Sequence, residues 1–243
     1  MWRARRQGWE PVALFNMLAA REERSRSHGL APAVLAAQAQ ALGLPLVTAR
    51  ADWSDYEVVF IATLRDEARR AEAVVFGDID LDAHREWEEK VCHAAGLEAV
   101  LPLWQQPRRA LVDEMIATGF VARICTVRDG VLPAAFLGRV LDDGCVRELE
   151  ALGVDPCGEA GEFHTLVVDP LPDAAPTATT RQSPSLSPGC LWRKPATHSA
   201  FASLNALAAL PAESSMVTPF QAMARLTLFR SVAEPHEPVA SSL

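Results

Sequence analysis

The feature that most constrains the fold is a regular alternation of short apolar runs and helix-like segments over the first 104 residues. The runs combine Val, Leu, Ile and Phe without interruption, which is typical of strands buried on both faces. The expected strands cover residues 11–18, 45–50, 73–79 and 98–104, and the expected helices cover residues 31–43, 56–71 and 82–96. This order predicts a doubly wound α/β fold with a parallel sheet, which binds ligands at the carboxyl ends of its strands.

Residues 107–169 follow a different pattern and predict a smaller α/β subdomain after a first domain at 1–106. A helix at 109–119 precedes a strand at 120–127, and a turn leads into a further strand near Phe163. Such a subdomain can close over the first domain and leave a cleft between them.

The chain changes character again after Asp169. Residues 170–189 are rich in Pro, Ser, Thr and Ala without periodicity, which is typical of disordered segments. We expect 170–243 to be a low-complexity, disordered tail that contains one possible helix at 219–232.

Composition narrows the class of protein. The formal charge of −8 disfavours a nucleic-acid backbone as the main partner, because such proteins present excess Lys and Arg. The five cysteines have irregular spacing, which favours reduced thiols and a cytoplasmic location over a disulfide framework. No apolar run approaches the length of a membrane span, and no signal peptide is recognisable, so we expect no membrane association.

Gly77 and Asp78 lie where the third expected strand ends, at the ligand-binding edge of the predicted sheet. A carboxylate beside a glycine can face a ligand there without steric obstruction, so Asp78 is a candidate nucleotide or substrate contact. The alternative is that Asp78 caps the helix at 82–96, a common role for Asp.

Arg85 and Trp104 are further candidates near the same edge. Arg85 follows the strand closely enough to meet a phosphate or carboxylate, or alternatively it pairs with Glu88 on the helix surface. Trp104 is either a core side chain at a domain junction or a platform for base stacking. The nearby potential metal ligands, whose spacing fits no type of zinc site, are His84, Cys92 and His93.

The segment 157–165 (CGEAGEFHT) carries the densest set of reactive side chains. A tight turn would let Glu159 and Glu162 point into one cleft. Paired carboxylates bind an amine, ammonium or Mg²⁺, or perform general acid–base chemistry. Gly158 and Gly161 permit a positive φ and a close approach of the backbone.

Two other interpretations of this segment stay open. It forms a polar hairpin turn without chemistry, or Cys157 acts as a nucleophile, which requires a histidine base nearby. His164 is close in sequence, but we expect it to alternate faces along the incoming strand.

In combination, these motifs resemble the diphthine–ammonia ligase family of ATP pyrophosphatases. That family has a Rossmann-like fold of the HUP type and belongs to the adenine nucleotide α-hydrolase group. The resemblance covers nearly all of residues 2–169. It rests on VVFGDI at 74–79, the Arg and Glu of HREWEEKVC at 84–92, PLW at 102–104, LGRVLD at 137–142 and DPCGEAGEFHTLVVD at 155–169.

The resemblance implies an ATP-dependent amidation. ATP, bound with Mg²⁺, adenylates a substrate carboxylate and releases pyrophosphate, and ammonia then displaces AMP. In archaea and eukaryotes the substrate is diphthine on elongation factor 2. The high ratio of Arg to Lys suggests a bacterial source, for which another carboxylate is expected.

The resemblance also implies roles for the candidate residues. Gly77, Asp78 and Arg85 line the nucleotide side. Glu159 and Glu162 are the catalytic pair. The expected substrate-side residues are Gly158, Gly161, His164, Thr165 and Trp104.

One departure from the family pattern concerns the first strand. The family opens with a strand and a Ser-Gly-Gly-Lys-Asp-Ser pyrophosphate loop, and this motif occurs nowhere in the sequence. We therefore expect an N-terminally truncated member whose sheet lacks its first, central strand. The alternative function is a non-catalytic or remnant nucleotide-binding protein. The change of character near residue 170 suggests a frameshift.

Overall fold

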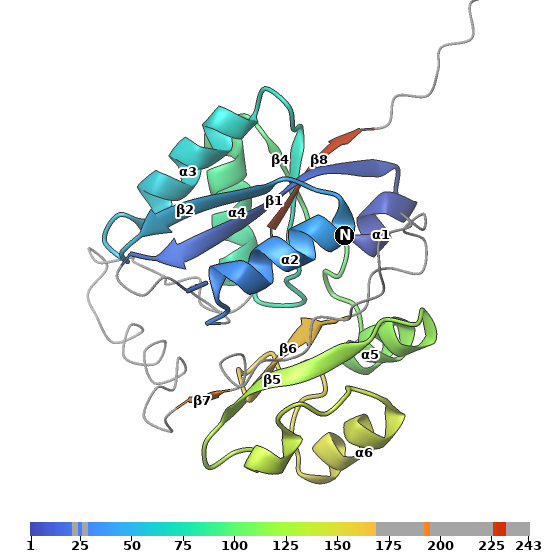
Figure 1. The fold of residues 1–243 in the computed structure, drawn as a ribbon. Coiled ribbons are helices and arrows are strands. Elements are labelled where there is room, and N and C mark those ends of the chain that lie inside the picture. Colours follow the sequence, from blue (N-terminus) through green and yellow to red (C-terminus); the bar gives the residue numbers. More distant parts are fainter. Residues whose placement is uncertain (21–23, 26–28, 169–191, 195–225, 232–243) are drawn as a thin grey trace, which may run out of the picture.

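The computed structural model describes residues 1–20, 24–25, 29–168, 192–194 and 226–231 (Figure 1). The helices are α1 (Trp2–Arg6), α2 (Pro32–Leu42), α3 (Tyr56–Glu67), α4 (Asp82–Ala95), α5 (Arg108–Ala117) and α6 (Asp143–Ala151), with a 3₁₀ turn η1 (Ala134–Phe136). The strands are β1 (Trp9–Ala19), β2 (Leu46–Ala51), β3 (Ala73–Val75), β4 (Glu98–Val100), β5 (Ala122–Arg128), β6 (Phe163–Val167), β7 (Trp192–Lys194) and β8 (Leu226–Ser231). No helix within these ranges is long and apolar enough to cross a membrane.

A five-stranded sheet forms the centre of the first unit, with the strand order β2-β1-β8-β3-β4. β1 runs parallel to β2, and β3 runs parallel to β4, as the alternation of strands and helices predicts. β8 lies between these two pairs and is antiparallel to both β1 and β3. The α/β fold with a Rossmann-like core is therefore confirmed, in a sheet of mixed direction.

β8 corrects one expectation about the tail. Residues 226–231 fall within the segment 219–232, for which a helix was predicted, but they form a strand. Leu228 and Phe229 are both fully buried, and they pack into different core clusters. Neighbouring side chains that are buried on opposite faces of a sheet are characteristic of a central strand. Most of the expected disordered tail, 170–243, lies outside the described residues.

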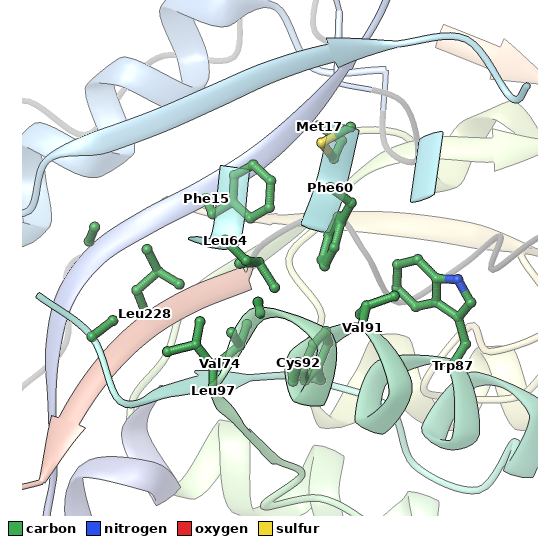
Figure 2. Packing of buried hydrophobic residues seen from close by; sticks show 14 of the residues in the cluster. Phe15, Met17, Phe60, Leu64, Val74, Trp87, Val91, Cys92, Leu97 and Leu228 are labelled. Atoms are coloured by element: carbon green, nitrogen blue, oxygen red, sulfur yellow. The ribbon is translucent and has the colours of Figure 1, made fainter. Parts of the chain in front are cut away.

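The main core lies between the sheet and helices α3 and α4 (Figure 2). The Phe60 ring of α3 packs 5.0 Å from the Trp87 ring of α4 and 5.2 Å from the Phe15 ring of β1, measured between centroids. Leu228 of β8 contributes to the same cluster. α4 ends at Gly96, whose φ of 77° closes the helix in the left-handed conformation. These contacts hold α4 against α3 and the sheet.

The second unit is built on a three-stranded sheet in the order β6-β5-β7, with β5 antiparallel to β6 and parallel to β7. α5 and α6 pack on this sheet through Val112, Val146 and Leu149. A separate cluster joins the two units, because Leu18 and Leu35 of the first unit pack with Cys125, Leu166 and Val168 of the second. The two sheets therefore share a buried contact.

Candidate functional site

A cavity of about 350 Å³ lies where the carboxyl end of β3 meets α5 and the segment that leads into β6. This volume lies at the lower end of the range for small-molecule sites. The wall formed by the first unit includes Val75, Phe76, Gly77, Ile79 and Leu103, and the wall formed by the second unit includes Leu111, Val112, Met115, Glu159, Phe163 and Thr165. The site therefore lies at the edge of the sheet where ligands of doubly wound folds bind.

Four of the residues singled out from the sequence line this cavity together: Gly77, Cys157, Glu159 and Thr165. Gly77 faces open space, because a Cβ atom added there would meet no heavy atom within 4 Å. The other candidates, which are not among the lining residues, are Asp78, Arg85, Trp104, Gly158, Gly161, Glu162 and His164.

Asp78 follows Gly77 of the cavity wall and is itself buried, with 2% of its surface exposed. Its Oδ1 atom is 2.7 Å from Nδ1 of His84, which is also buried. Because an ionised carboxylate only accepts hydrogen bonds, Nδ1 of His84 carries the hydrogen. The alternative role for Asp78 is wrong, since the N-cap residue of α4 is Leu81 and no side chain caps that end.

Glu88 is the functional candidate that sequence reasoning missed. It was considered only as a surface partner of Arg85, but the structure buries it to 1% exposure. Its Oε2 atom and Oδ2 of Asp78 are both buried without a hydrogen-bond partner among the described residues. Burial, followed by the nearby charge of Asp78, raises the pKa of Glu88 far above its usual range. The signal in the sequence was the i, i+4 spacing of His84 and Glu88, which places both on one helix face.

Arg85 lies on the outer side of the same helix. Its guanidinium group stacks over the Trp104 ring at 4.9 Å from the centroid. It also forms ion pairs with Asp82 at 3.3 Å and Glu89 at 3.8 Å. The backbone N–H of Gln105 donates to the Ile79 carbonyl oxygen at 2.6 Å, which ties together the segments that follow β3 and β4. Arg85 and Trp104 therefore form one cation–π pair at this edge.

The segment before β6 is held by the carboxylate of Asp155. Its oxygens accept hydrogen bonds from the backbone N–H groups of Cys157 at 3.0 Å and Glu159 at 3.3 Å. Arg108 donates to Asp155 and also binds Asp80, through Nε at 2.9 Å and Nη2 at 2.8 Å. Because Asp80 belongs to the segment after β3, Arg108 links the two walls of the cavity.

The backbone conformation and the close contact at position 158 both require glycine. Its φ is 69°, and a Cβ atom there would lie 2.9 Å from the Phe163 carbonyl oxygen. Gly161 has a φ of 72°, and its N–H donates to the Gly158 carbonyl oxygen at 2.9 Å. Arg128 of β5 binds the Ala160 carbonyl oxygen. The two glycines therefore shape the turn that carries Glu159.

The two predicted catalytic carboxylates occupy different surroundings. Glu159 lines the cavity, and burial, reinforced by the charge of Asp78, raises its pKa to about 7. Glu162 is not among the lining residues. Its Oε2 atom is buried and has no hydrogen-bond partner among the residues that the structure describes.

The arrangement of β6 matches the expected alternation. Phe163 and Thr165 face the cavity, whereas His164 is buried and is not among the lining residues. Cys157 lines the cavity, but its thiol donates to the Arg108 carbonyl oxygen at 3.2 Å, and burial raises its pKa to about 12. A thiol that holds its proton at neutral pH is a poor nucleophile, which disfavours the cysteine mechanism.

Negative charge predominates around Glu159. Its pKa responds to Asp78, Asp155 and Asp80 as neighbouring acids and to Arg108 as the neighbouring cation. Among the described residues, no group of three or more His, Cys, Asp or Glu side chains has a geometry that could hold a metal ion. The site therefore places a carboxyl group and a guanidinium group beside an apolar cavity.

Comparison with known proteins identifies the family. The diphthamide synthase N-terminal domain matches residues 1–99, and the diphthamide synthase C-terminal domain matches residues 107–173, which together make up more than half of the chain. The chain belongs to the diphthine–ammonia ligase family. The diphthine–ammonia ligase of Bos taurus is 33% identical over 118 residues, which are 47% of this chain and 43% of that protein. The protein of the same name from Danio rerio is 35% identical over 107 residues, 42% of each chain.

The resemblance inferred from the motifs is thus confirmed at the level of the family. The diphthine–ammonia ligase of Schizosaccharomyces pombe is 34% identical over 101 residues, which are 40% of this chain and 17% of that protein. The chain of this family member spans less than half the length of the relatives it matches.

Proposed function

We propose that this diphthine–ammonia ligase family member acts in an ATP-dependent amidation. A carboxylate is activated as an acyl adenylate and then converted to an amide by ammonia. The observation that supports the proposal most directly is the shared cavity, where Gly77 at the carboxyl end of β3 faces Glu159 and Thr165 of the second unit. A reaction between a nucleotide and a second substrate requires a site that holds both of them close together, and here each wall of the cavity can contact one of them.

The nucleotide side of the proposed site is the segment after β3. Gly77 leaves room for a ligand, and Arg85, held over Trp104, presents a partly exposed guanidinium group that we assign to a phosphate of ATP. ATP would arrive with Mg²⁺ on its phosphates. Because no described cluster of side chains is placed to hold a metal ion, we derive no step through a protein-bound metal.

The proposed amidation takes place in two steps. The substrate carboxylate oxygen attacks the α-phosphorus of ATP, the bond between the α- and β-phosphates breaks, and pyrophosphate leaves. Ammonia then attacks the acyl carbon, and the bond to the AMP oxygen breaks as AMP takes the electron pair. The attacking nitrogen loses one proton, so the products are an amide, AMP and a proton.

We assign Glu159 as the general base that accepts this proton. Its carboxyl group lines the cavity, and its pKa of about 7 is matched to accepting a proton near neutral pH. The apolar walls keep water from the acyl adenylate, which water would otherwise hydrolyse. The catalytic role of Glu162 and the substrate contacts of Gly158, Gly161, His164 and Trp104 stay predictions.

The proposed substrates follow from the family. ATP and ammonia are common to the reaction, and the name of the relatives indicates diphthine as the acceptor carboxylate. In this chain the carboxylate is either diphthine on elongation factor 2 or, for a bacterial protein, another acid. The reaction would take place in the cytoplasm.

A second candidate is a nucleotide-binding protein without catalysis. It is favoured by the antiparallel β8, which lies between β1 and β3. In doubly wound folds that position carries a parallel strand, whose end positions phosphate through backbone N–H groups.

The deciding experiment measures the release of AMP and pyrophosphate from ATP in the presence of ammonium and a panel of carboxylates, together with ATP binding by calorimetry. The ligase proposal expects AMP and pyrophosphate in equal amounts, dependent on both ammonium and a carboxylate. Binding of ATP with only background turnover would instead establish the non-catalytic candidate. A Glu159→Gln variant should lose turnover while it still binds ATP.

A further inference from the structure

Three ionisable side chains are buried in α4 and in the segment that follows Gly77 of the cavity wall. Asp78, His84 and Glu88 have 2%, 5% and 1% of their surfaces exposed, respectively. Burial of ionisable groups is costly unless each is paired or neutral, so their hydrogen bonds must be accounted for.

Two oxygen atoms in this cluster have no hydrogen-bond partner within the part of the chain that the structure describes. Oδ1 of Asp78 accepts a hydrogen bond from His84, but Oδ2 of Asp78 and Oε2 of Glu88 are both buried without a donor among the described residues. The Asp78 and Glu88 carboxyl groups are nevertheless close enough for the charge of Asp78 to act on Glu88. Two neighbouring carboxyl groups form a hydrogen bond only if one of them carries a proton, and one shared proton would satisfy both oxygens.

The surroundings decide which group holds that proton. Asp78 has His84 as a hydrogen-bond donor, whereas Glu88 faces the negative charges of Asp78 and Glu89 and the uncharged thiol of Cys92. Deep burial further favours the neutral form of Glu88, and the pKa shift has the same direction.

We propose that Glu88 is a positioning residue that stays protonated at neutral pH and donates a hydrogen bond to Asp78, thereby fixing the segment after β3 against α4. This inference rests on the proposed function, because Asp78 adjoins Gly77 in the cavity wall and its charge acts on Glu159. A neutral Glu88 allows one negative charge on Asp78 to remain next to Gly77 of the cavity wall.

The proposal is tested without turnover by comparing Glu88→Gln with Glu88→Leu. Gln keeps a neutral donor, whereas Leu keeps the bulk but leaves Asp78 Oδ2 without a partner. We expect Glu88→Gln to melt within about 2 °C of the parent, and Glu88→Leu to melt about 5 °C lower. Glu86→Leu, the same change at an exposed position of α4, is the control for helix effects.

Infrared spectroscopy measures the proton itself. At pH 8.5 the parent should show the carbonyl stretch of a protonated carboxyl group, and Glu88→Gln should lack that band. Absence of the band from the parent would overturn the proposal. Equal melting temperatures for the Gln and Leu variants would also overturn it, since Glu88 would then only fill space, as would a Gln variant less stable than the Leu variant.

The pH dependence of turnover distinguishes a positioning role of Glu88 from a role in packing alone. In Glu88→Leu, Asp78 loses a donor and takes up a proton more readily, so Glu159 loses a negative neighbour. The pH–rate profile should then shift to lower pH, whereas Glu88→Gln keeps the parent profile. An unshifted Leu variant would overturn the link to Glu159. If the parent shows no turnover, the proposed function fails, but the melting and infrared results still decide the protonation of Glu88.

Discussion

Among individual residues, the contrast between Glu159 and Glu162 shows how surroundings decide chemistry. The two carboxylates are three positions apart, yet only Glu159 is among the residues that line the cavity. Gly158 precedes Glu159 and Gly161 lies between the two glutamates, both with a positive φ, and Asp155 accepts a hydrogen bond from the N–H of Glu159. The residue types and their spacing were evident from the sequence. The direction of each side chain depends on these turn contacts, which spacing alone does not specify.

The role of Glu159 predicts a pH-dependent loss of activity. A general base works only when deprotonated, so turnover should rise with pH through about 7 and level off above it. Glu159→Gln should lower the rate at pH 8 about 100-fold and leave ATP affinity within about twofold. Rates of AMP release from pH 5.5 to 9 check this. An equal loss in Glu162→Gln would show that both carboxylates act, as the sequence predicts.

Gly77 and Gly158 predict opposite phenotypes for the same substitution. Gly158→Ala places Cβ 2.9 Å from the Phe163 carbonyl oxygen at a φ of 69°. It should lower the free energy of unfolding by about 2 kcal/mol. Gly77→Ala has open space and should leave stability unchanged while it weakens ligand binding. Urea unfolding and ATP calorimetry measure the two effects. If Gly158→Ala is as stable as the parent, the turn has another conformation.

At the scale of elements, prediction succeeded where the signal is local. β1 to β4 and α2 to α4 each follow from a continuous run or periodic segment, because neighbouring residues determine them. β8 was mistaken for a helix because its partners are distant: Arg230 of β8 pairs with Glu10, 220 positions earlier. The position between β1 and β3 offers unpaired backbone groups on both sides, and this tertiary pairing outweighs local helical preference.

The central position of β8 predicts large effects from truncating its core side chains. Leu228→Ala and Phe229→Ala each remove a fully buried side chain and should cost about 3 kcal/mol. The melting temperature should fall by about 6–12 °C. Arg230→Ala is the control, because Arg230 is exposed and its ion pair contributes little. If all three variants melt alike, β8 does not occupy the sheet in solution.

On the scale of the whole molecule, the site exists because two units meet. The sequence predicted a cleft between the first domain and the second unit, and the cavity lies there. It did not predict Arg108, which holds Asp80 of one wall and Asp155 of the other. Nothing in the neighbourhood of Arg108 in the sequence indicates these partners, since the contacts depend on how the two sheets pack.

Arg108 also tunes the proposed base, which yields a prediction for the assembled molecule. Its positive charge lowers the pKa of Glu159, opposing burial and the neighbouring acids. Arg108→Gln should therefore move the rising limb of the pH–rate profile upward by roughly one pH unit. The matched control is Arg109→Gln, which removes the same charge from α5 but breaks ion pairs with Asp113 and Glu150.

The pH dependence of the free energy of unfolding is a second test of the effect of Arg108 on Glu159. The pKa of Glu159 is higher in the folded protein than its ordinary value of 4.5, so the folded state binds more protons between pH 4.5 and about 7. This carboxyl group therefore makes stability fall as the pH rises through that window, and Arg108→Gln should extend the fall to higher pH. Urea unfolding at pH 5, 7 and 8.5 measures the difference between the two arginine variants. Equal pH dependence in both would mean that Arg108 does not act on Glu159 and serves only to hold Asp80 and Asp155 together.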